Sequence, residues 1–341
     1  MAPRVSAPSR PGWKLSEVVK PFARAVVTGA SGFIGTRLVA RLAGQGVEVV
    51  AVDIATPRAV LPGVSYVTAD VREPLDPRLA EGADAIYNLA AVHRTPGHPP
   101  HEYYDTNVKG AAHVAALAEA AGVALIVFTS SISVYGPSET PLTEDSPLRP
   151  TTDYGRSKRM AEEVHRGWLE GGADRRLVTV RPGVVFGPGE RGNYTRLARA
   201  LKRGLFVYPG RRDAVKSGGH VDELLRAIDF AVGLGRREVL FNFAFPEEST
   251  TEQIVEAFAR TAGYRRAFAT LPLPPLLAAA RVFEAADRLG LKNPIHRERV
   301  MKLVRSTRVT PRWLLDNGYR FELDLETALA HWNAETHGHF D

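Results

Sequence analysis

The stretch Val26-Val27-Thr28-Gly29-Ala30-Ser31-Gly32-Phe33-Ile34-Gly35 decides the fold of this chain. It overlaps an apolar run, residues 25–27, that predicts a buried strand, and its three glycines follow at a spacing of three. A helix-compatible segment, residues 36–43, comes next and is closed by Gly44. In a strand, glycine turn and helix arranged in this way, free backbone N–H groups at the helix N-terminus point toward a phosphate. We therefore expect this stretch to bind the pyrophosphate of a dinucleotide.

Each glycine of this turn has a separate steric role. Gly29 permits the tight turn, Gly32 lets a pyrophosphate approach the backbone, and Gly35 lets the helix pack closely on the strand. The usual dinucleotide fingerprint is Gly-x-Gly-x-x-Gly, whereas this chain carries Gly-x-x-Gly-x-x-Gly. An ordinary glycine-rich loop is the alternative, so the interpretation depends on the sequence that follows. The residues expected to contact the cofactor here are Gly29, Ser31, Gly32, Phe33, Ile34 and Gly35.

Composition excludes several classes of protein. The 341 residues are 44% hydrophobic and 24% charged, as in soluble globular proteins. No apolar run reaches about 18 residues, so we expect neither a transmembrane helix nor a membrane partner. The absence of cysteine excludes disulfides, thiolate metal sites and cysteine nucleophiles, and it fits a reducing cytosol. The first residues lack the apolar core of a secretion signal, so we expect a cytoplasmic protein.

The positive charge is concentrated in three segments. The net charge of +6 consists of +4 in residues 1–24, +6 in residues 189–216, +6 in residues 281–320 and −10 elsewhere. Two local basic regions in the second half favour recognition of an anionic small molecule. Aromatic residues do not alternate with these bases in the way that base stacking requires, so we expect no nucleic-acid partner.

Short apolar runs alternate with helical patterns through the first half of the chain. The expected strands after the first are residues 47–52, 64–67, 85–89, 124–129 and 177–180, and the longer expected helices are 103–121 and 153–170. Strands that alternate with helices of about ten or more residues predict βαβ units and a parallel sheet covered on both faces. The fold class that we expect is therefore α/β, with a doubly wound parallel sheet.

The remaining segments give the expected domain organisation. Residues 1–20 are rich in Pro, Ser and Arg and predict a mobile N-terminal extension. Residues 21–188 form the dinucleotide-binding domain, to which a strand and a helix return near residues 215–245. Residues 189–341 form a smaller, mixed substrate-binding lobe that is interleaved with the first domain. We expect this lobe to close over the carboxyl edge of the sheet, where ligands bind in doubly wound folds.

Asp53 lies 18 residues after Gly35, at the end of the second expected strand. A carboxylate there can accept hydrogen bonds from the adenosine ribose hydroxyls and would repel a 2′-phosphate. This position favours NAD over NADP. An aspartate that only forms a strand-end turn is the alternative, and the nearby cation of Arg58 opposes the NAD interpretation.

Tyr154 and Lys158 are four residues apart on an expected helix, which places phenol and ammonium on the same face. An unperturbed phenol has a pKa of about 10 and is a poor base near neutral pH. An ammonium within about 4–6 Å lowers such a pKa by about 1–3 units, and an oxidised nicotinamide acts in the same direction. The tyrosine can then take a hydroxyl proton while hydride leaves the same carbon. Because Tyr-x-x-x-Lys is common by chance, the pair indicates a catalytic site only together with other motifs.

Those motifs begin with residues 128–136, Phe-Thr-Ser-Ser-Ile-Ser-Val-Tyr-Gly, directly after an expected strand. With them the sequence resembles the extended short-chain dehydrogenase/reductases, which have a Rossmann fold, and within these the nucleotide-sugar epimerase/dehydratase group. The resemblance spans about residues 23–245. The matching pieces, in family order, are the glycine turn, Asp70-Val71, Asn88-Leu-Ala-Ala91, Asn107, Ser130-Ser131 with Val134-Tyr135-Gly136, Tyr154 to Lys158, Arg181-Pro-Gly-Val-Val-Phe-Gly-Pro188 and His220-Val-Asp222.

The resemblance implies a role for each matching position. Tyr154 would be the catalytic acid/base, Lys158 would bind the nicotinamide ribose, and Ser131 would hydrogen-bond the reacting oxygen. Further implied cofactor contacts are Asp70, Val71, Leu89, Ala90, Ala91, His93, Asn107, Thr129, Pro182 and Val184, together with Tyr154 and Lys158. Implied substrate contacts are His93, Ser131, Ser133, Asn193 and Lys216, the last two toward the diphosphate.

The chain departs from the family pattern at two places. Dehydratases of this group carry an Asp-Glu pair where this chain has Ile132 and Ser133, which argues against 4,6-dehydration. Some 4-epimerases carry Asn where this chain has Val184.

We therefore expect an NAD-dependent 4-epimerase of a nucleoside-diphosphate sugar, with UDP as the expected nucleotide, acting through a transient 4-keto sugar. A 4-reductase or dehydrogenase of a keto-sugar nucleotide is the nearest alternative. A hydroxysteroid dehydrogenase and a non-catalytic NAD sensor stay open. The resemblance also implies a homodimer formed through helices 103–121 and 153–170. The histidines show no metal-binding spacing, so no metal is expected.

Overall fold

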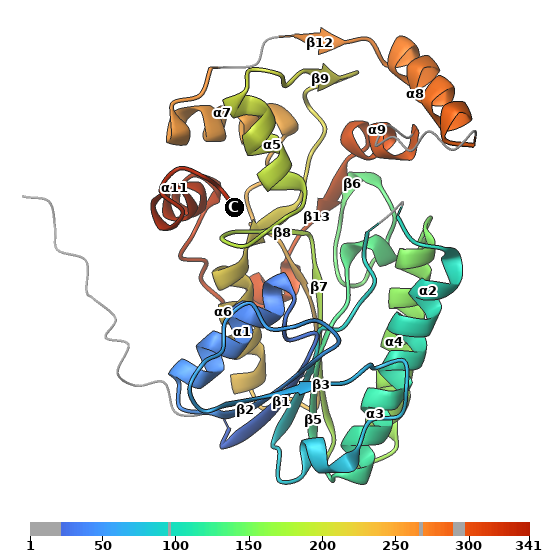
Figure 1. The fold of residues 1–341 in the computed structure, drawn as a ribbon, viewed down its shortest axis with the longest axis vertical. Coiled ribbons are helices and arrows are strands. Elements are labelled where there is room, and N and C mark those ends of the chain that lie inside the picture. The colour runs from blue at the N-terminus through green and yellow to red at the C-terminus, as the bar shows by residue number, and fades with distance from the viewer. Residues whose placement is uncertain (1–21, 95–96, 266–268, 289–296) are drawn as a thin grey trace, which may run out of the picture.

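A seven-stranded parallel sheet lies at the centre of the computed structural model, which describes residues 22–94, 97–265, 269–288 and 297–341 (Figure 1). Within these residues the strand order is β11-β7-β5-β4-β1-β2-β3. The strands are β1 (Arg24–Thr28), β2 (Glu48–Asp53), β3 (Val64–Thr68), β4 (Ala85–Asn88), β5 (Leu125–Thr129), β7 (Arg176–Pro182) and β11 (Glu238–Phe243). The α/β, doubly wound fold is thus confirmed. The predicted N-terminal extension, residues 1–20, lies outside the described residues.

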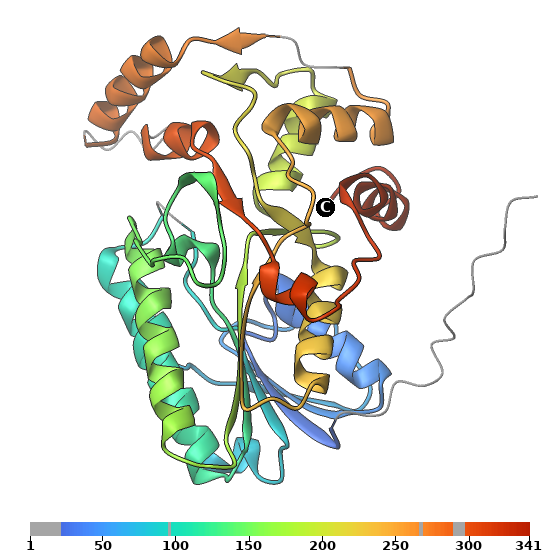
Figure 2. The ribbon, with the colours of Figure 1, turned by 180° about the vertical axis from the view of Figure 1, so that it is seen from behind.

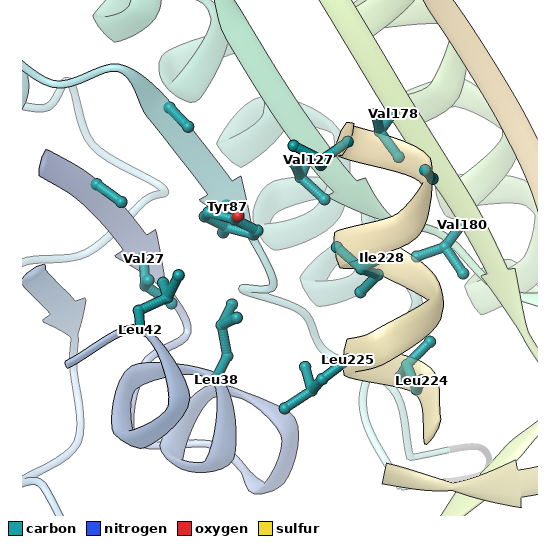
Figure 3. Packing of buried hydrophobic residues seen from close by; sticks show 14 of the residues in the cluster. Val27, Leu38, Leu42, Tyr87, Val127, Val178, Val180, Leu224, Leu225 and Ile228 are labelled. Atoms are coloured by element: carbon teal, nitrogen blue, oxygen red, sulfur yellow. The ribbon is translucent and has the colours of Figure 1, made fainter. Parts of the chain in front are cut away.

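The pleat of each strand divides its apolar side chains between two cores. In β1, Val27 faces one core and Val26 faces the other, because successive side chains in a strand point to opposite faces. Helices α1 (Phe33–Gly44), α6 (Val221–Gly233) and α10 (Arg312–Asp316) cover the first face. Helices α3 (Gly110–Ala120) and α4 (Asp153–Glu170) cover the second. Figure 3 shows Leu38 and Leu42 of α1, with Leu224, Leu225 and Ile228 of α6, packed against strand residues on the first face.

The predicted helix over residues 103–121 is divided into three consecutive pieces. These are α2 (Pro100–Tyr104), a π-helical turn (Asp105–Lys109) and α3. Asn107 lies in the π-helical turn, and its side chain bonds the backbone of Val92 and the Ser157 hydroxyl. Such turns often occur where a helix places a functional side chain.

The second lobe has its own aromatic core above the sheet (Figures 1 and 2). Its helices are α5 (Asn193–Lys202), α7 (Thr251–Ala262), α8 (Leu273–Arg288), α9 (Arg297–Val304) and α11 (Leu325–Glu335). Three pairs of short parallel strands connect its segments, namely β8 (Val184–Phe186) with β10 (Gly218–His220), β9 (Tyr208–Pro209) with β12 (Thr270–Leu271), and β6 (Ser138–Leu142) with β13 (Thr307–Val309). The proline-rich start of α8 is compatible with a helix because Pro is tolerated in a first turn.

The carboxyl ends of β1, β4 and β5 meet near the point where the strand order reverses. Strand β1 pairs with β2 on one side and with β4 on the other, so successive crossovers run in opposite directions from it. Ligands of doubly wound sheets bind at this kind of edge. No helix among the described residues is long and apolar enough to span a bilayer.

Candidate active site

The loop after β5 carries the first catalytic candidates. Strand β5 ends at Thr129, and a short 3-10 helix, Ile132–Val134, follows. The Ser131 side chain caps this helix by accepting a hydrogen bond from the Ser133 N–H at 3.1 Å. The cap fixes the loop so that Ser131 lies at the carboxyl edge of the sheet.

Helix α4 brings Tyr154 to this loop through a glycine contact. The Thr152 hydroxyl caps α4 by accepting from the Gly155 N–H at 3.1 Å. A Cβ placed on Gly155 would lie only 2.4 Å from the Ser133 carbonyl oxygen. The loop and the helix can therefore approach this closely only because residue 155 has no side chain.

Tyr154 is paired with Ser131 in the structure. Burial raises the pKa of Tyr154 above its usual value, and a side-chain hydrogen bond with Ser131 opposes that rise. The ring of Tyr103 lies 6.5 Å from the Tyr154 ring, between centroids, and closes one side of the site. A phenol and a hydroxyl joined in this way can both contact one oxygen atom of a substrate.

Lys158 lies one turn further along α4 and is buried. Its Nζ donates to the Thr129 carbonyl oxygen at 2.9 Å and lies 4.8 Å from the centroid of the Phe128 ring. Burial lowers the pKa of Lys158 to about 7, and the negative charge of Glu162 works against that shift. In the chain by itself the pKa of Tyr154 is raised, because desolvation of the buried phenol outweighs the hydrogen bond with Ser131. The lowering of this pKa by Lys158 in a site that holds NAD stays a prediction.

A buried ion pair lies beneath Lys158. Glu162 accepts from Arg181 Nε at 2.9 Å and from Arg181 Nη2 at 2.6 Å, and the Ser130 hydroxyl also donates to it. The two charged side chains are 7% and 4% exposed. Two parallel N–H···O bonds of this kind are strong and geometrically specific. The pair therefore joins the catalytic helix, the catalytic loop and strand β7.

The same network continues to β11 and α10. Arg181 Nη1 donates to the Tyr135 hydroxyl at 2.7 Å, and that hydroxyl donates to Asn242 Oδ1 at 2.8 Å. Glu144 accepts from the backbone N–H groups of Asn242 and Trp313, at 2.8 and 3.2 Å. Segments that are distant in sequence thus share one set of buried hydrogen bonds.

The glycine turn has the geometry predicted for a pyrophosphate site. Gly29 has a φ of +72°, and a Cβ there would lie 2.6 Å from the Ala90 nitrogen. A Cβ on Gly35 would lie 2.1 Å from the Gly29 carbonyl oxygen. Gly32 is the N-cap of α1, and its position has no capping side chain, so first-turn N–H groups stay available to an anion.

Asp53 lies beside this turn at the end of β2. Its two carboxylate oxygens accept from the N–H groups of Ser31 and Ala55, each at 2.9 Å. Arg58 donates to the Gly189 carbonyl oxygen at 3.0 Å, so the loop after β8 lies near the turn. The carboxylate therefore lies beside the glycine turn, and its contact with an adenosine ribose stays a prediction.

Other predicted cofactor positions line the same edge or support it. Leu89, Ala90 and Ala91 follow β4, and the Asn107 amide bonds both backbone groups of Val92 just beyond them. His93 is exposed at the surface, and desolvation together with the positive charges of Arg94 and Lys158 lowers its pKa. The Asp70 carboxylate binds the Arg72 guanidinium, which lowers the pKa of Asp70.

A comparison with protein families matches residues 25–242 to the NAD dependent epimerase/dehydratase family. The chain belongs to this family. As a member it uses NAD, and its chemistry is that of a nucleotide-sugar epimerase or dehydratase. The predicted family and cofactor are therefore confirmed.

Characterised members of the family resemble the chain over most of its length. It is 30% identical to the N-acetyl-alpha-D-glucosaminyl-diphospho-ditrans,octacis-undecaprenol 4-epimerase of Escherichia coli O157:H7, over 86% of this chain and 89% of that protein. It is 34% identical to a UDP-glucose 4-epimerase of Mycolicibacterium smegmatis, over 70% of this chain and 83% of that protein.

Solved structures of family members share the fold. MoeE5 in complex with UDP-glucose and NAD aligns with a TM-score of 0.72 at 24% identity, over 92% of this chain and 99% of that one. The UDP-glucuronic acid 4-epimerase from Bacillus cereus, in complex with NAD, aligns with a TM-score of 0.74 at 17% identity, over 93% and 100%.

The described residues fit NAD. The uncapped start of α1 offers N–H groups to a pyrophosphate, and the bare Gly29 and Gly35 leave no side chain in its way. Asp53 is positioned for the adenosine ribose, and Lys158 lies at the opposite end of the same edge. These groups would hold the two halves of the dinucleotide across the switch point of the sheet.

Four further predicted positions lie at the end of β7 or in the segments that follow it. Pro182 ends β7, and Val184 pairs with Gly218 in the β8–β10 sheet. Asn193 starts α5 and accepts a hydrogen bond from Arg196. The Lys216 ammonium donates to the carbonyl oxygens of Lys302 and Arg305 at the end of α9, and burial lowers its pKa to about 8.

The sequence missed two groups that the structure assembles. Glu162 follows Lys158 by four residues, and this helical spacing was the available signal. His220, Asp222 and His331 bring possible metal-binding atoms within 4.8 Å of one another, which sequence spacing could not show. The guanidinium of Arg37 binds both oxygens of Asp222, at 2.9 and 2.8 Å, and its positive charge opposes a cation there.

Proposed function

We propose that this chain is an NAD-dependent 4-epimerase that acts on a sugar carried by a diphosphate. The observation that carries the proposal is the position of Tyr154 beside the Ser131–Ser133 loop, which Gly155 allows α4 to approach, one helical turn from the Lys158 ammonium. These groups lie at the sheet edge that also carries the glycine turn. Donors and a base placed around one oxygen suit the oxidation of a secondary alcohol.

The residues divide the proton chemistry between them. Bound NAD would supply the acceptor and donor of the hydride that leaves and returns to C4 of the sugar. Tyr154 Oη takes the C4 hydroxyl proton as the C4–H bond breaks, and Ser131 donates a hydrogen bond to the same oxygen. The 4-keto sugar then rotates in the site and presents the opposite face of C4 to the cofactor. Tyr154 returns the proton to the C4 oxygen as hydride returns to that face. Because burial raises the Tyr154 pKa, the Lys158 charge has to favour the phenolate in the loaded site.

The loop residues support epimerisation over dehydration. Ile132 packs against the apolar cluster of Val134, Tyr135 and Ala244. Ile132 and Ser133 provide no carboxyl group to protonate a leaving hydroxyl or to abstract a proton next to the ketone. A 4-reductase would use the same three residues, and it differs in consuming cofactor.

Two carriers of the sugar are candidates. A UDP-hexose is supported by the UDP-glucose 4-epimerase of Mycolicibacterium smegmatis. A polyprenyl-diphosphate sugar is supported by the lipid-linked substrate named for the Escherichia coli relative, which aligns over more of both chains. Both carriers present a diphosphate, and both would suit the basic second half of the chain.

The test is a direct assay with each carrier. Purified protein is incubated with UDP-glucose, UDP-N-acetylglucosamine or polyprenyl-diphosphate N-acetylglucosamine, and the sugars are analysed by NMR. We expect interconversion at C4 of one of them without net NADH formation. Tyr154→Phe should abolish turnover and keep NAD binding. Net consumption of NADH, loss of water from the sugar, or full activity of Tyr154→Phe would overturn the proposal.

We also propose a homodimer formed by α3 and α4. Their outer faces carry small residues, among them Ala112, Ala116 and Gly167, which line a shallow groove. Small side chains permit close helix packing. Light scattering should show a dimer, and Ala116→Arg should convert it to a monomer. A monomeric wild-type chain would refute this part of the proposal.

A further inference from the structure

Exposed apolar side chains gather at one end of the second lobe. Leu205 and Val207 lie in the loop after α5, Leu271 lies in β12, and Phe283 and Leu303 lie in α8 and α9. Leu205 is 72% exposed. Figures 1 and 2 both place β9, β12, α8 and α9 at the end of the molecule away from the central sheet. We call the surface formed by these five side chains the lobe tip.

The elements of the lobe tip are in contact with one another. Strands β9 and β12 pair in register, with Pro209 opposite Leu271. A Cβ on Gly210 would lie 3.3 Å from the Leu273 Cβ and 3.7 Å from the Val304 Cγ2. The start of α8 and the end of α9 therefore meet beside β9. The exposed apolar side chains thus belong to one structural unit.

The same unit is strongly basic. Residues 191–212 contain seven Lys or Arg and residues 263–283 contain three, and neither segment contains Asp or Glu. Exposed bases of these segments that pair with no carboxylate in the described part of the chain are Arg191, Arg196, Arg199, Lys202, Arg203, Arg265 and Arg281.

Four acidic side chains that the structure describes near the lobe tip already have partners. Glu252 binds Arg212, and Glu256 and Glu326 bind Arg260. Glu284 accepts a hydrogen bond from the backbone N–H of Arg297. The surface therefore presents excess positive charge next to apolar side chains.

We propose that the lobe tip docks on an anionic lipid surface. Apolar side chains bordered by Lys and Arg enter the headgroup region while the bases contact anionic lipids. A nucleic-acid face would offer the same charge, but it would gain nothing from exposed Leu and Val. The prediction of no membrane partner depended on the absence of a spanning apolar segment, which does not bear on docking at a surface. Docking at this end would leave the catalytic edge free, whichever carrier bears the sugar.

The test uses the full chain and sedimentation with lipid vesicles. We expect binding to vesicles that contain phosphatidylglycerol, weaker binding as salt rises, and no binding to pure phosphatidylcholine. Lys202→Glu with Arg203→Glu should lower the partition coefficient by at least about twenty-fold, since each lost base near an anionic surface is worth about five-fold. Leu205→Asp should also weaken binding.

A matched control separates docking from general damage. Leu234→Asp changes an exposed leucine at the end of α6, away from the lobe tip, and should bind vesicles as the unaltered chain does. Equal binding to both vesicle types, or an equal loss in the control, would overturn the proposal. A change of oligomeric state in the lobe-tip variants without a change in vesicle binding would instead assign the surface to a second copy. Because no readout is turnover, these outcomes are independent of the 4-epimerase proposal.

Discussion

Replacing Glu162 by Gln tests the buried network beneath the catalytic lysine. The substitution keeps the shape of the side chain and removes its negative charge. Arg181 stays buried in the variant. Its two hydrogen bonds to the Glu162 carboxylate, of 2.9 and 2.6 Å, then face a neutral amide. The Ser130 hydroxyl also loses a charged acceptor.

The expected loss of stability follows from burial. Removing one partner of a buried ion pair costs about 3–5 kcal/mol, because the other charge stays desolvated and unpaired. The neighbouring Glu163 provides the matched control, since it pairs with Arg159 on the exposed face of the same helix. Glu163→Gln should cost less than about 1 kcal/mol, as exposed ion pairs do.

The assay is urea denaturation followed by circular dichroism, with turnover measured across pH. The free energy of unfolding of Glu162→Gln should fall well below that of Glu163→Gln. Because the Glu162 charge opposes the lowering of the Lys158 pKa, the variant should lose the ammonium at a lower pH than the about 7 of the native chain. As the pH rises, the activity of the variant should therefore begin to decline at a lower pH than that of the native chain. Equal stability of the two variants with superimposable pH profiles would refute the reasoning.

Two further predictions concern packing and acid stability. Gly155→Ala should abolish turnover and destabilise the fold by about 1–3 kcal/mol, because its Cβ would meet the Ser133 oxygen at 2.4 Å, whereas Gly233→Ala at the end of α6, where nothing lies within 4 Å, should leave activity intact; equal activities would contradict this. Burial lowers the pKa of His165 and of His220 to about 4, so both are neutral in the fold and take up protons on unfolding below about pH 6.5. Stability should therefore be complete above pH 6.5 and decrease as the pH falls toward 4, and a urea midpoint that stays constant over this range would contradict the assignment.

Local patterns predicted the sheet and the cofactor edge well. The strands of a parallel sheet are buried on both faces, so they appear as continuous apolar runs, and β1, β2 and β5 were found close to their expected positions. The glycine turn could be predicted because each glycine meets a local steric demand. The Ser131–Tyr154 pair could be predicted because the family resemblance supplied what the spacing of Tyr154 and Lys158 left open.

Contacts between distant segments could not be predicted in the same way. Arg181 and Glu162 pair because β7 passes under α4, and no periodicity records that crossing. The contact of Lys216 with a diphosphate stays a prediction, and no spacing showed that its ammonium donates to the carbonyl oxygens of Lys302 in α9 and of Arg305 just after it. Asn107 was expected as a cofactor contact, and the π-helical turn that directs its amide to the backbone of Val92 has no signal in the sequence.

The position of β11 at the edge of the central sheet limits how this enzyme can be engineered. A chimera spliced at residue 188 would lose β11 and α6, and it would leave the Tyr135 hydroxyl without Asn242. Exchange of substrate lobes between relatives therefore needs several junctions, so that β11 stays in the sheet it belongs to and α6 stays packed against that sheet.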